Sequence, residues 1–177
     1  GSTNTGLKIN KSQAANASAS APLIAETGGL NAMIVDSTAL PERAVSDIVT
    51  SAFQSAGQRC SALRLLYLQE DIADNFLTML YGAMDELKVG DPWQLDTDVG
   101  PLISDDARGD IQTYIDNAEQ QLRLLKKVAI PSNGYFIAPT VIKVGGINDM
   151  AKEIFGPVLH VATFKASEID RLVEDIN

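Results

Sequence analysis

The stretch SAGQRCSALR holds the only cysteine of the 177-residue chain, Cys60. A thiolate is a strong nucleophile, and Cys60 lies in a short link between a predicted helix and a predicted strand; links at the ends of a sheet are a common place for a site in α/β proteins. Arg59 comes directly before this cysteine and offers a positive charge that would favour the thiolate. The residues leave a second interpretation open, in which Cys60 is an inert small side chain of the core.

Glu26 is the second candidate for chemistry. It ends the apolar run PLIAE and is followed by Thr27, Gly28 and Gly29. A carboxylate at the end of a strand, partly removed from water and close to backbone, suits a general base. The alternative is a solvated acid in a loop, and these residues alone do not decide between the two.

Two further stretches suggest cofactor binding, though weakly by themselves. In EIFGPVL, Glu153 could bind ribose hydroxyls and Phe155 could contact a flat ring. The opening GSTNTGLKI places Gly1 and Ser2 where a helix begins, and the free amides of a helix start bind phosphate. Its spacing is not GxGxxG, so no dinucleotide site follows from it. His160 lies inside the strand-like run PVLHVATF without a partner at triad spacing, which favours a structural role.

The elements that must position these residues alternate between helix and strand. Apolar patterns predict helices over residues 41–57, 71–87 and about 105–125, and a last one near 169–176. Strand-like runs cover residues 22–27, 31–36, 62–69, 138–144 and 157–164. Pro41 suits a first helical turn, Gly57 suits a C-cap, and Leu122 is expected to face inward. This alternation predicts an α/β domain with a mostly parallel sheet and helices on both faces.

Composition limits the class of protein. Hydrophobic residues make up 45% and charged residues 21%, as in ordinary globular domains, and no apolar run approaches the length of a membrane span. The net charge of −9 argues against nucleic acid as a partner. One cysteine and one histidine provide neither an internal disulfide nor a zinc cluster, so we expect no metal and a reducing cytoplasmic setting.

Taken together and in order, these motifs resemble the aldehyde dehydrogenase superfamily over essentially the whole chain. AETGGLNAMIVD is similar to the family's general-base motif, with Glu26 as the base, and SAGQRCSALR to its nucleophile motif, with Cys60 as the thiol. EIFGPVL and GSTNTG are similar to the segments that contact NAD. The resemblance implies an aldehyde dehydrogenase-like fold and these cofactor-binding residues: Gly1, Ser2, Thr27, Gly28, Glu153 and Phe155.

Within that family, IAETGGLNAMIVDSTAL and SAFQSAGQRCSALRLLYLQEDIAD look most like the dehydrogenase module of the bifunctional proline utilization enzymes. This implies NAD-dependent oxidation of L-glutamate-γ-semialdehyde to glutamate, with FAD used only by a separate proline dehydrogenase domain. Ser61 fits a substrate that carries a carboxylate. The resemblance also implies an oligomeric parent enzyme and an inactive piece in the form of this chain, with residues 1–25 as the tail of the NAD-binding domain and residues 26–177 as a catalytic domain truncated at both ends.

Two other functions stay open at this point. One is a thiol hydrolase that uses Cys60 and Glu26 without a nucleotide, although no histidine lies near the thiol in sequence. The other is a non-catalytic binding module in which Cys60 belongs to the core.

Overall fold

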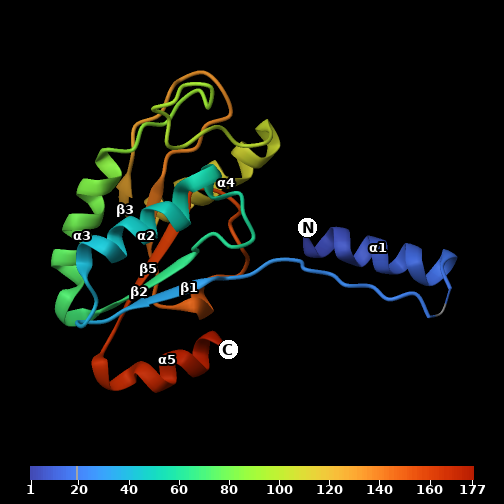
Figure 1. The fold of residues 1–177 in the computed structure, drawn as a ribbon, viewed down its shortest axis with the longest axis horizontal. Coiled ribbons are helices and arrows are strands. Elements are labelled where there is room, and N and C mark those ends of the chain that lie inside the picture. The colour runs from blue at the N-terminus through green and yellow to red at the C-terminus, as the bar shows by residue number, and fades with distance from the viewer. Residues whose placement is uncertain (19) are drawn as a thin grey trace.

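The structure is a computed structural model that describes residues 1–18 and 20–177 (Figure 1). Its α-helices are α1 (Thr3–Asn16), α2 (Pro41–Phe53), α3 (Glu70–Asp85), α4 (Asp105–Gln120) and α5 (Ile169–Ile176). Its strands are β1 (Ala32–Val35), β2 (Leu65–Gln69), β3 (Leu124–Lys127), β4 (Thr140–Lys143) and β5 (Val158–Phe164). Short 3₁₀ turns cover Gln54–Gly57, Ile147–Asp149 and Ala166–Glu168.

The strands form one sheet in the order β1-β2-β5-β4-β3. Neighbouring strands run parallel except β3, which is antiparallel to β4 at the edge. The inner strand β2 reads LLYLQ and is buried along its whole length, as expected for a parallel strand covered on both faces. The predicted α/β class with a mostly parallel sheet is confirmed.

Helices cover both faces of this sheet, which was also predicted. Successive residues of β2 point to opposite faces, so Leu66 and Leu68 join the larger core while Leu65 and Tyr67 join the smaller one. The larger core packs against α2, α3 and α4. The smaller core includes Leu172 of α5, which lies beneath the sheet in Figure 1.

The segment after α2 corrects one expectation. The helix begins at Pro41 as predicted but ends at Phe53, so Gly57 is not its C-cap. Ser55, Ala56 and Gly57 all have left-handed backbone, with φ of 57°, 52° and 65°. A Cβ on Gly57 would lie 2.2 Å from the carbonyl oxygen of Gly156, so glycine is needed here for a close backbone approach.

The end of α4 differs from the prediction as well. The helix starts after the N-cap Ser104 but ends at Gln120, before the expected limit near residue 125. Leu122 has a left-handed φ of 56° and is 92% exposed, so the expectation that it faces inward is wrong. The chain reverses there so that Leu124–Lys127 can add the unpredicted edge strand β3 to β4. The backbone hydrogen bonds that β3 makes with β4 thus outweigh the tendency of residues 121–125 to continue α4.

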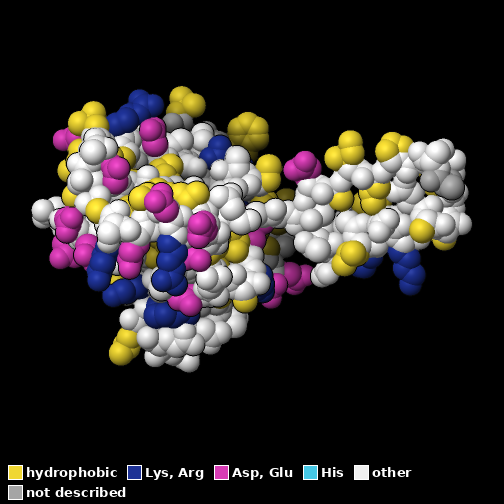
Figure 2. All heavy atoms as spheres, turned by 90° about the horizontal axis from the view of Figure 1, so that it is seen from below, with side chains coloured by type: hydrophobic (Ala, Val, Ile, Leu, Met, Phe, Trp, Pro, Cys, Tyr) yellow, Lys and Arg dark blue, Asp and Glu magenta, His cyan; other side chains and the backbone are white. Residues whose placement is uncertain are grey.

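The N-terminal residues form an arm beside the sheet domain (Figure 1). None of the residues of α1 is buried, and residues 21–31 return as an extended segment without strand pairing, so the strand-like reading of 22–27 is wrong. Figure 2 shows hydrophobic side chains exposed along this arm, where Leu7, Ile9 and Ile24 are more than half exposed. The Ala- and Ser-rich stretch 10–21 is helical as far as Asn16, where α1 ends, and Ala19 lies outside the described residues.

In the described part of the chain, no helix is both long and apolar enough to cross a membrane.

Candidate active site

One pocket of about 550 Å³ gathers nearly all the residues singled out in the sequence. It is lined by Gly1, Ser2, Thr3, Asn4, Glu26, Thr27, Gly28, Cys60, Lys152, Glu153 and Phe155. The candidate thiol, the candidate base and the candidate cofactor-binding residues therefore line the same pocket. Ser61 follows Cys60 in the same turn but does not line this pocket.

The sheet order explains why segments so far apart in sequence meet. Glu26 precedes β1, Cys60 precedes β2 and Glu153 precedes β5, and these three strands are parallel neighbours. The amino ends of these strands therefore lie side by side. Ligand sites of open parallel sheets usually lie at the carboxyl ends of the strands, so this site lies at the opposite ends.

Cys60 lies in an exposed turn between the left-handed segment 55–57 and β2. The side-chain amide of Asn31 holds this turn by donating to the carbonyl oxygens of Cys60 (2.7 Å) and Ala62 (2.9 Å). The chain that carries Glu26 thus supports the turn that carries the thiol. Sequence reasoning missed Asn31, although a polar side chain at the start of an apolar strand was a signal.

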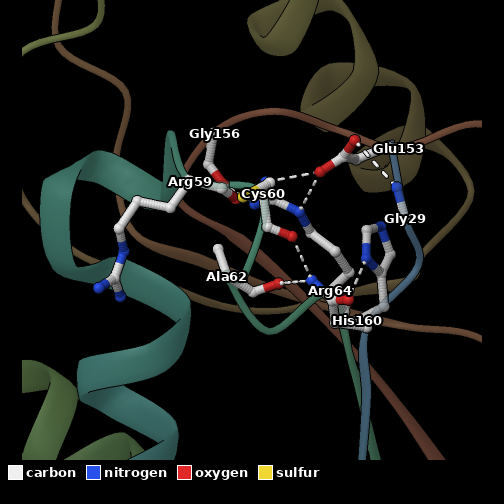
Figure 3. Close-up of polar contacts among 9 residues, drawn as sticks. Gly29, Arg59, Cys60, Ala62, Arg64, Glu153, Gly156 and His160 are labelled. Atoms are coloured by element: carbon white, nitrogen blue, oxygen red, sulfur yellow. Dashed lines mark hydrogen bonds and ion pairs between the residues drawn. The ribbon is translucent and has the colours of Figure 1, made fainter. Parts of the chain in front are cut away.

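Arg59 does not serve the thiol in the way we expected. Its guanidinium donates to the carbonyl oxygen of Thr50 on α2 (3.2 Å), and Figure 3 shows this side chain pointing away from Cys60. The positive charge of Arg59 therefore stabilises the C-terminal end of α2, where cations are favoured, and not the thiolate of Cys60.

Glu26 is exposed in the extended segment and does not end a strand, so the expectation of a partly desolvated carboxylate is wrong. Its backbone carbonyl accepts a hydrogen bond from the backbone nitrogen of Gly1 (3.0 Å), and the carbonyl of Thr27 accepts one from the Thr3 hydroxyl (3.0 Å). These bonds fasten the start of α1 to the segment that carries Glu26.

An ion pair between Arg64 and Glu153 lies behind the pocket (Figure 3). Arg64 is fully buried, and its Nε and Nη2 donate to Glu153 Oε1 at 3.0 and 2.8 Å. Burial lowers the pKa of Arg64 while Glu153 raises it again, so the guanidinium keeps its charge. A charged residue inside the apolar run ALRLLYLQ was the signal in the sequence, because a buried charge needs a partner.

The other atoms of this pair shape the wall of the pocket. Glu153 Oε2 lies 3.4 Å from the amide of Gly29, and a Cβ on Gly28 would lie 3.2 Å from that same oxygen. Gly28 has a φ of 133°, so its backbone reaches the acid in a conformation that glycine favours. The half-exposed ring of Phe155 lies against the Arg64 guanidinium, whose Cζ is 5.2 Å from the ring centroid.

His160 is fully buried under the pair, in the structural role that we expected. Its Nδ1 lies 2.9 Å from the carbonyl oxygen of Arg64, and because a carbonyl only accepts, Nδ1 carries the proton. Its Nε2 then accepts from the hydroxyl of Tyr114 at 2.8 Å. Burial lowers the pKa of His160 from 6.5 to about 4, so the ring is neutral near pH 7.

This low pKa predicts a loss of stability in mild acid. The unfolded chain binds the proton near pH 6.5, whereas the folded chain resists it down to about pH 4. The contribution of His160 to the free energy of unfolding is therefore fully present above about pH 6.5. Protonation of the unfolded chain should lower that free energy by about 2 kcal/mol at pH 5 and about 3 kcal/mol at pH 4.

Urea unfolding of the chain and of His160→Gln across this range would measure the effect. Carboxylates titrate in both proteins, so the difference between the two curves reports the histidine. The variant should show a clearly flatter decline, and parallel curves would contradict the prediction.

Among the described residues, no group of three or more His, Cys, Asp or Glu side chains is arranged to hold a metal ion.

Comparison with known families gives one match along the full length. The model of the aldehyde dehydrogenase family matches residues 1–177. The bifunctional protein PutA of Klebsiella aerogenes is 49% identical over 164 residues, which cover 88% of this chain and 12% of that protein. A 1-pyrroline-5-carboxylate dehydrogenase of Geobacillus thermodenitrificans is 40% identical over 158 residues, with 88% and 30% covered. The chain thus spans well under half the length of these relatives.

Solved structures agree with the sequence matches. A variant of proline utilization A from Bradyrhizobium japonicum superimposes with a TM-score of 0.93 at 44% identity, covering 99% of this chain and 18% of that one. Betaine aldehyde dehydrogenase from Staphylococcus aureus in complex with NAD⁺ gives a TM-score of 0.86 at 31% identity, with 98% and 36% covered.

Proposed function

Because the chain belongs to the aldehyde dehydrogenase family, we propose that it supplies the thiol-bearing part of an NAD-dependent dehydrogenase. Its substrate would be L-glutamate-γ-semialdehyde, the open form of pyrroline-5-carboxylate, and its product glutamate. The observation that carries this proposal is the single pocket shared by Cys60, Glu26 and the candidate cofactor residues. The similarity to proteins named PutA and 1-pyrroline-5-carboxylate dehydrogenase supports the choice of substrate.

Cys60 would start the reaction as the nucleophile. Its exposed thiolate attacks the aldehyde carbon, a sulfur–carbon bond forms, and the carbonyl oxygen takes the electron pair. The N–H of Cys60 makes no hydrogen bond with the part of the chain that the structure describes. It is therefore available to donate to this oxyanion, next to the bond that forms.

The residues on the opposite wall fit a dinucleotide. The α1 helix starts at the pocket with its N-cap Ser2 and has no acid in its first turn, which favours a pyrophosphate at Gly1 and Ser2. Glu153 Oε2 accepts from the amide of Gly29 and has a further lone pair for ribose hydroxyls, and a Cβ on Gly28 would lie only 3.2 Å from that oxygen. NAD, when bound, supplies the acceptor for the hydride of the substrate carbon. Thr27 and Phe155 complete the wall.

Glu26 would complete the turnover as the general base. Its solvated carboxylate takes a proton from water, the resulting hydroxide adds to the thioester carbon, and the carbon–sulfur bond breaks to free the Cys60 thiolate. Ser61 would contribute outside the pocket, near the carboxylate of the substrate.

The arm supports the proposed division of the chain. We place residues 1–25 with the NAD-binding domain and residues 26–177 with the catalytic domain, because α1 buries no residue against the sheet domain. A reducing cytoplasm, which keeps a lone exposed thiol free, remains our proposed location.

The proposal is tested by the absorbance of reduced NAD when the full-length gene product is mixed with NAD and L-glutamate-γ-semialdehyde. Turnover is expected there, whereas the 177-residue chain alone should give none, since it covers 12% and 30% of the two relatives. Ester hydrolysis without NAD, and no aldehyde oxidation, would instead favour the thiol hydrolase. The exposure of Cys60 argues against the part of the binding-module alternative that places this cysteine in the core.

A further inference from the structure

We propose that Arg64 is a positioning residue that orients and polarises the backbone N–H of Cys60 as an oxyanion donor. The inference rests on the proposed role of Cys60 as the nucleophile. Arg64 makes no contact with the thiol and does not itself line the pocket, although it contacts Glu153 and Phe155 of the wall, so it would act on Cys60 through the peptide unit between Arg59 and Cys60.

The peptide unit itself provides the link. Arg64 Nη2 donates to the carbonyl oxygen of Arg59 at 3.1 Å, and that carbonyl shares a peptide bond with the N–H of Cys60. No peptide bond in the described chain is cis, so C=O and N–H of this unit point in opposite directions. The carbonyl faces the buried guanidinium, and the N–H therefore faces the exposed side on which Cys60 lies.

The guanidinium can hold this orientation because it is fixed on every side. It bonds to Glu153 Oε1 through two nitrogens and to the carbonyl oxygen of Gly156 at 3.2 Å, and it lies against the ring of Phe155. Figure 3 shows Arg64 between the Cys60 turn and Glu153. The backbone of Arg64 is fixed as well, since its N–H donates to the backbone carbonyl oxygen of Asn31 (3.0 Å).

Charge strengthens the effect. A hydrogen bond from a cation is stronger than one from a neutral donor, and in a buried setting it polarises the bonds next to it. The amide of Ala62 donates to the same carbonyl oxygen at 3.1 Å, so two donors draw electrons from one peptide unit. The N–H of Cys60 then carries more positive charge toward the pocket.

Two reactions of the same thiol separate this role from a merely structural one. With p-nitrophenyl acetate, the thiolate bonds to the acyl carbon, an oxyanion develops, and p-nitrophenolate leaves. With iodoacetamide, the thiolate bonds to a saturated carbon, iodide leaves, and no oxyanion develops. Cys60 is the only cysteine, so both rates on the 177-residue chain report this one sulfur.

The proposal expects Arg64→Met to lower the ratio of acylation to alkylation about 100-fold, and Arg64→Lys, which keeps the buried charge, about 10-fold. If Arg64→Met does not fold, Arg64→Lys carries the same comparison. Asn31→Ala is the matched control, because Asn31 holds the carbonyls of Cys60 and Ala62 and not the unit that contains the N–H. It should change both rates alike.

Equal changes of both rates in the Arg64 variants, within about twofold, would overturn the proposal. So would a wild-type ratio no higher than that of N-acetylcysteine, because the N–H would then give no help to an oxyanion. The two proposals can fail separately. If the ratio of acylation to alkylation falls in the Arg64 variants but the full-length gene product oxidises no aldehyde, the proposed function is wrong and this inference still holds.

Discussion

Replacing Cys60 with alanine is expected to lower aldehyde-dependent NAD reduction by the full-length gene product by about 10⁴-fold or more, the scale seen when a covalent enzyme loses its nucleophile. The physical reason is that no other thiol in this chain can form the sulfur–carbon bond. The initial rate of reduced-cofactor formation measures the effect.

Cys60→Ser is the sharper version of the same experiment. It keeps nearly the same shape but offers a hydroxyl that is almost fully protonated near neutral pH, so it should be nearly as inactive. Because Cys60 is exposed, both variants should unfold within about 0.5 kcal/mol of the wild type. A serine variant that keeps a tenth or more of the wild-type rate would contradict the assignment of Cys60 as nucleophile.

Replacing Glu26 with glutamine is expected to lower the steady-state rate by about 10²–10⁴-fold, the usual contribution of a general base. The first turnover should survive, because Glu26 is proposed to act only on the thioester. Rapid mixing should therefore show a burst of reduced cofactor that matches the amount of Cys60, followed by almost no further change.

Glu42→Gln is the matched control for this experiment. Glu42 is an exposed glutamate in the first turn of α2 and does not line the pocket, so its loss should leave both burst and steady state near wild type. Loss of the burst in Glu26→Gln would mean that the acid acts before the thioester forms. An unchanged steady state would remove Glu26 from the mechanism.

The sequence by itself was sufficient for the elements with strong local patterns. Apolar residues at helical spacing predicted α2 and α3, Pro41 marked the start of a helix, and the apolar run ALRLLYLQ predicted the buried strand β2. The ordered motifs around Glu26, Cys60 and Glu153 also predicted the family, because each combines special residues in a fixed local order.

Local patterns failed where a distant part of the chain competes for the same backbone. Leu122 fits the helical spacing of α4, yet pairing of residues 124–127 with β4 outweighs that spacing. Glu26 follows an apolar run that reads as a strand, but no neighbouring strand pairs with it, so the segment stays extended and the carboxylate stays in water.

The site shows the same division between chemistry and placement. Residue types alone identified a thiol, a carboxylate and a small-residue turn as candidates for reaction and binding. Only the tertiary structure decided that Arg59 turns away to α2 and that Arg64 takes the central position. Arg64 and Glu153 are 89 residues apart, and the physical reason for their pairing is that a buried guanidinium must find an opposite charge and carbonyl acceptors wherever the folded sheet brings them.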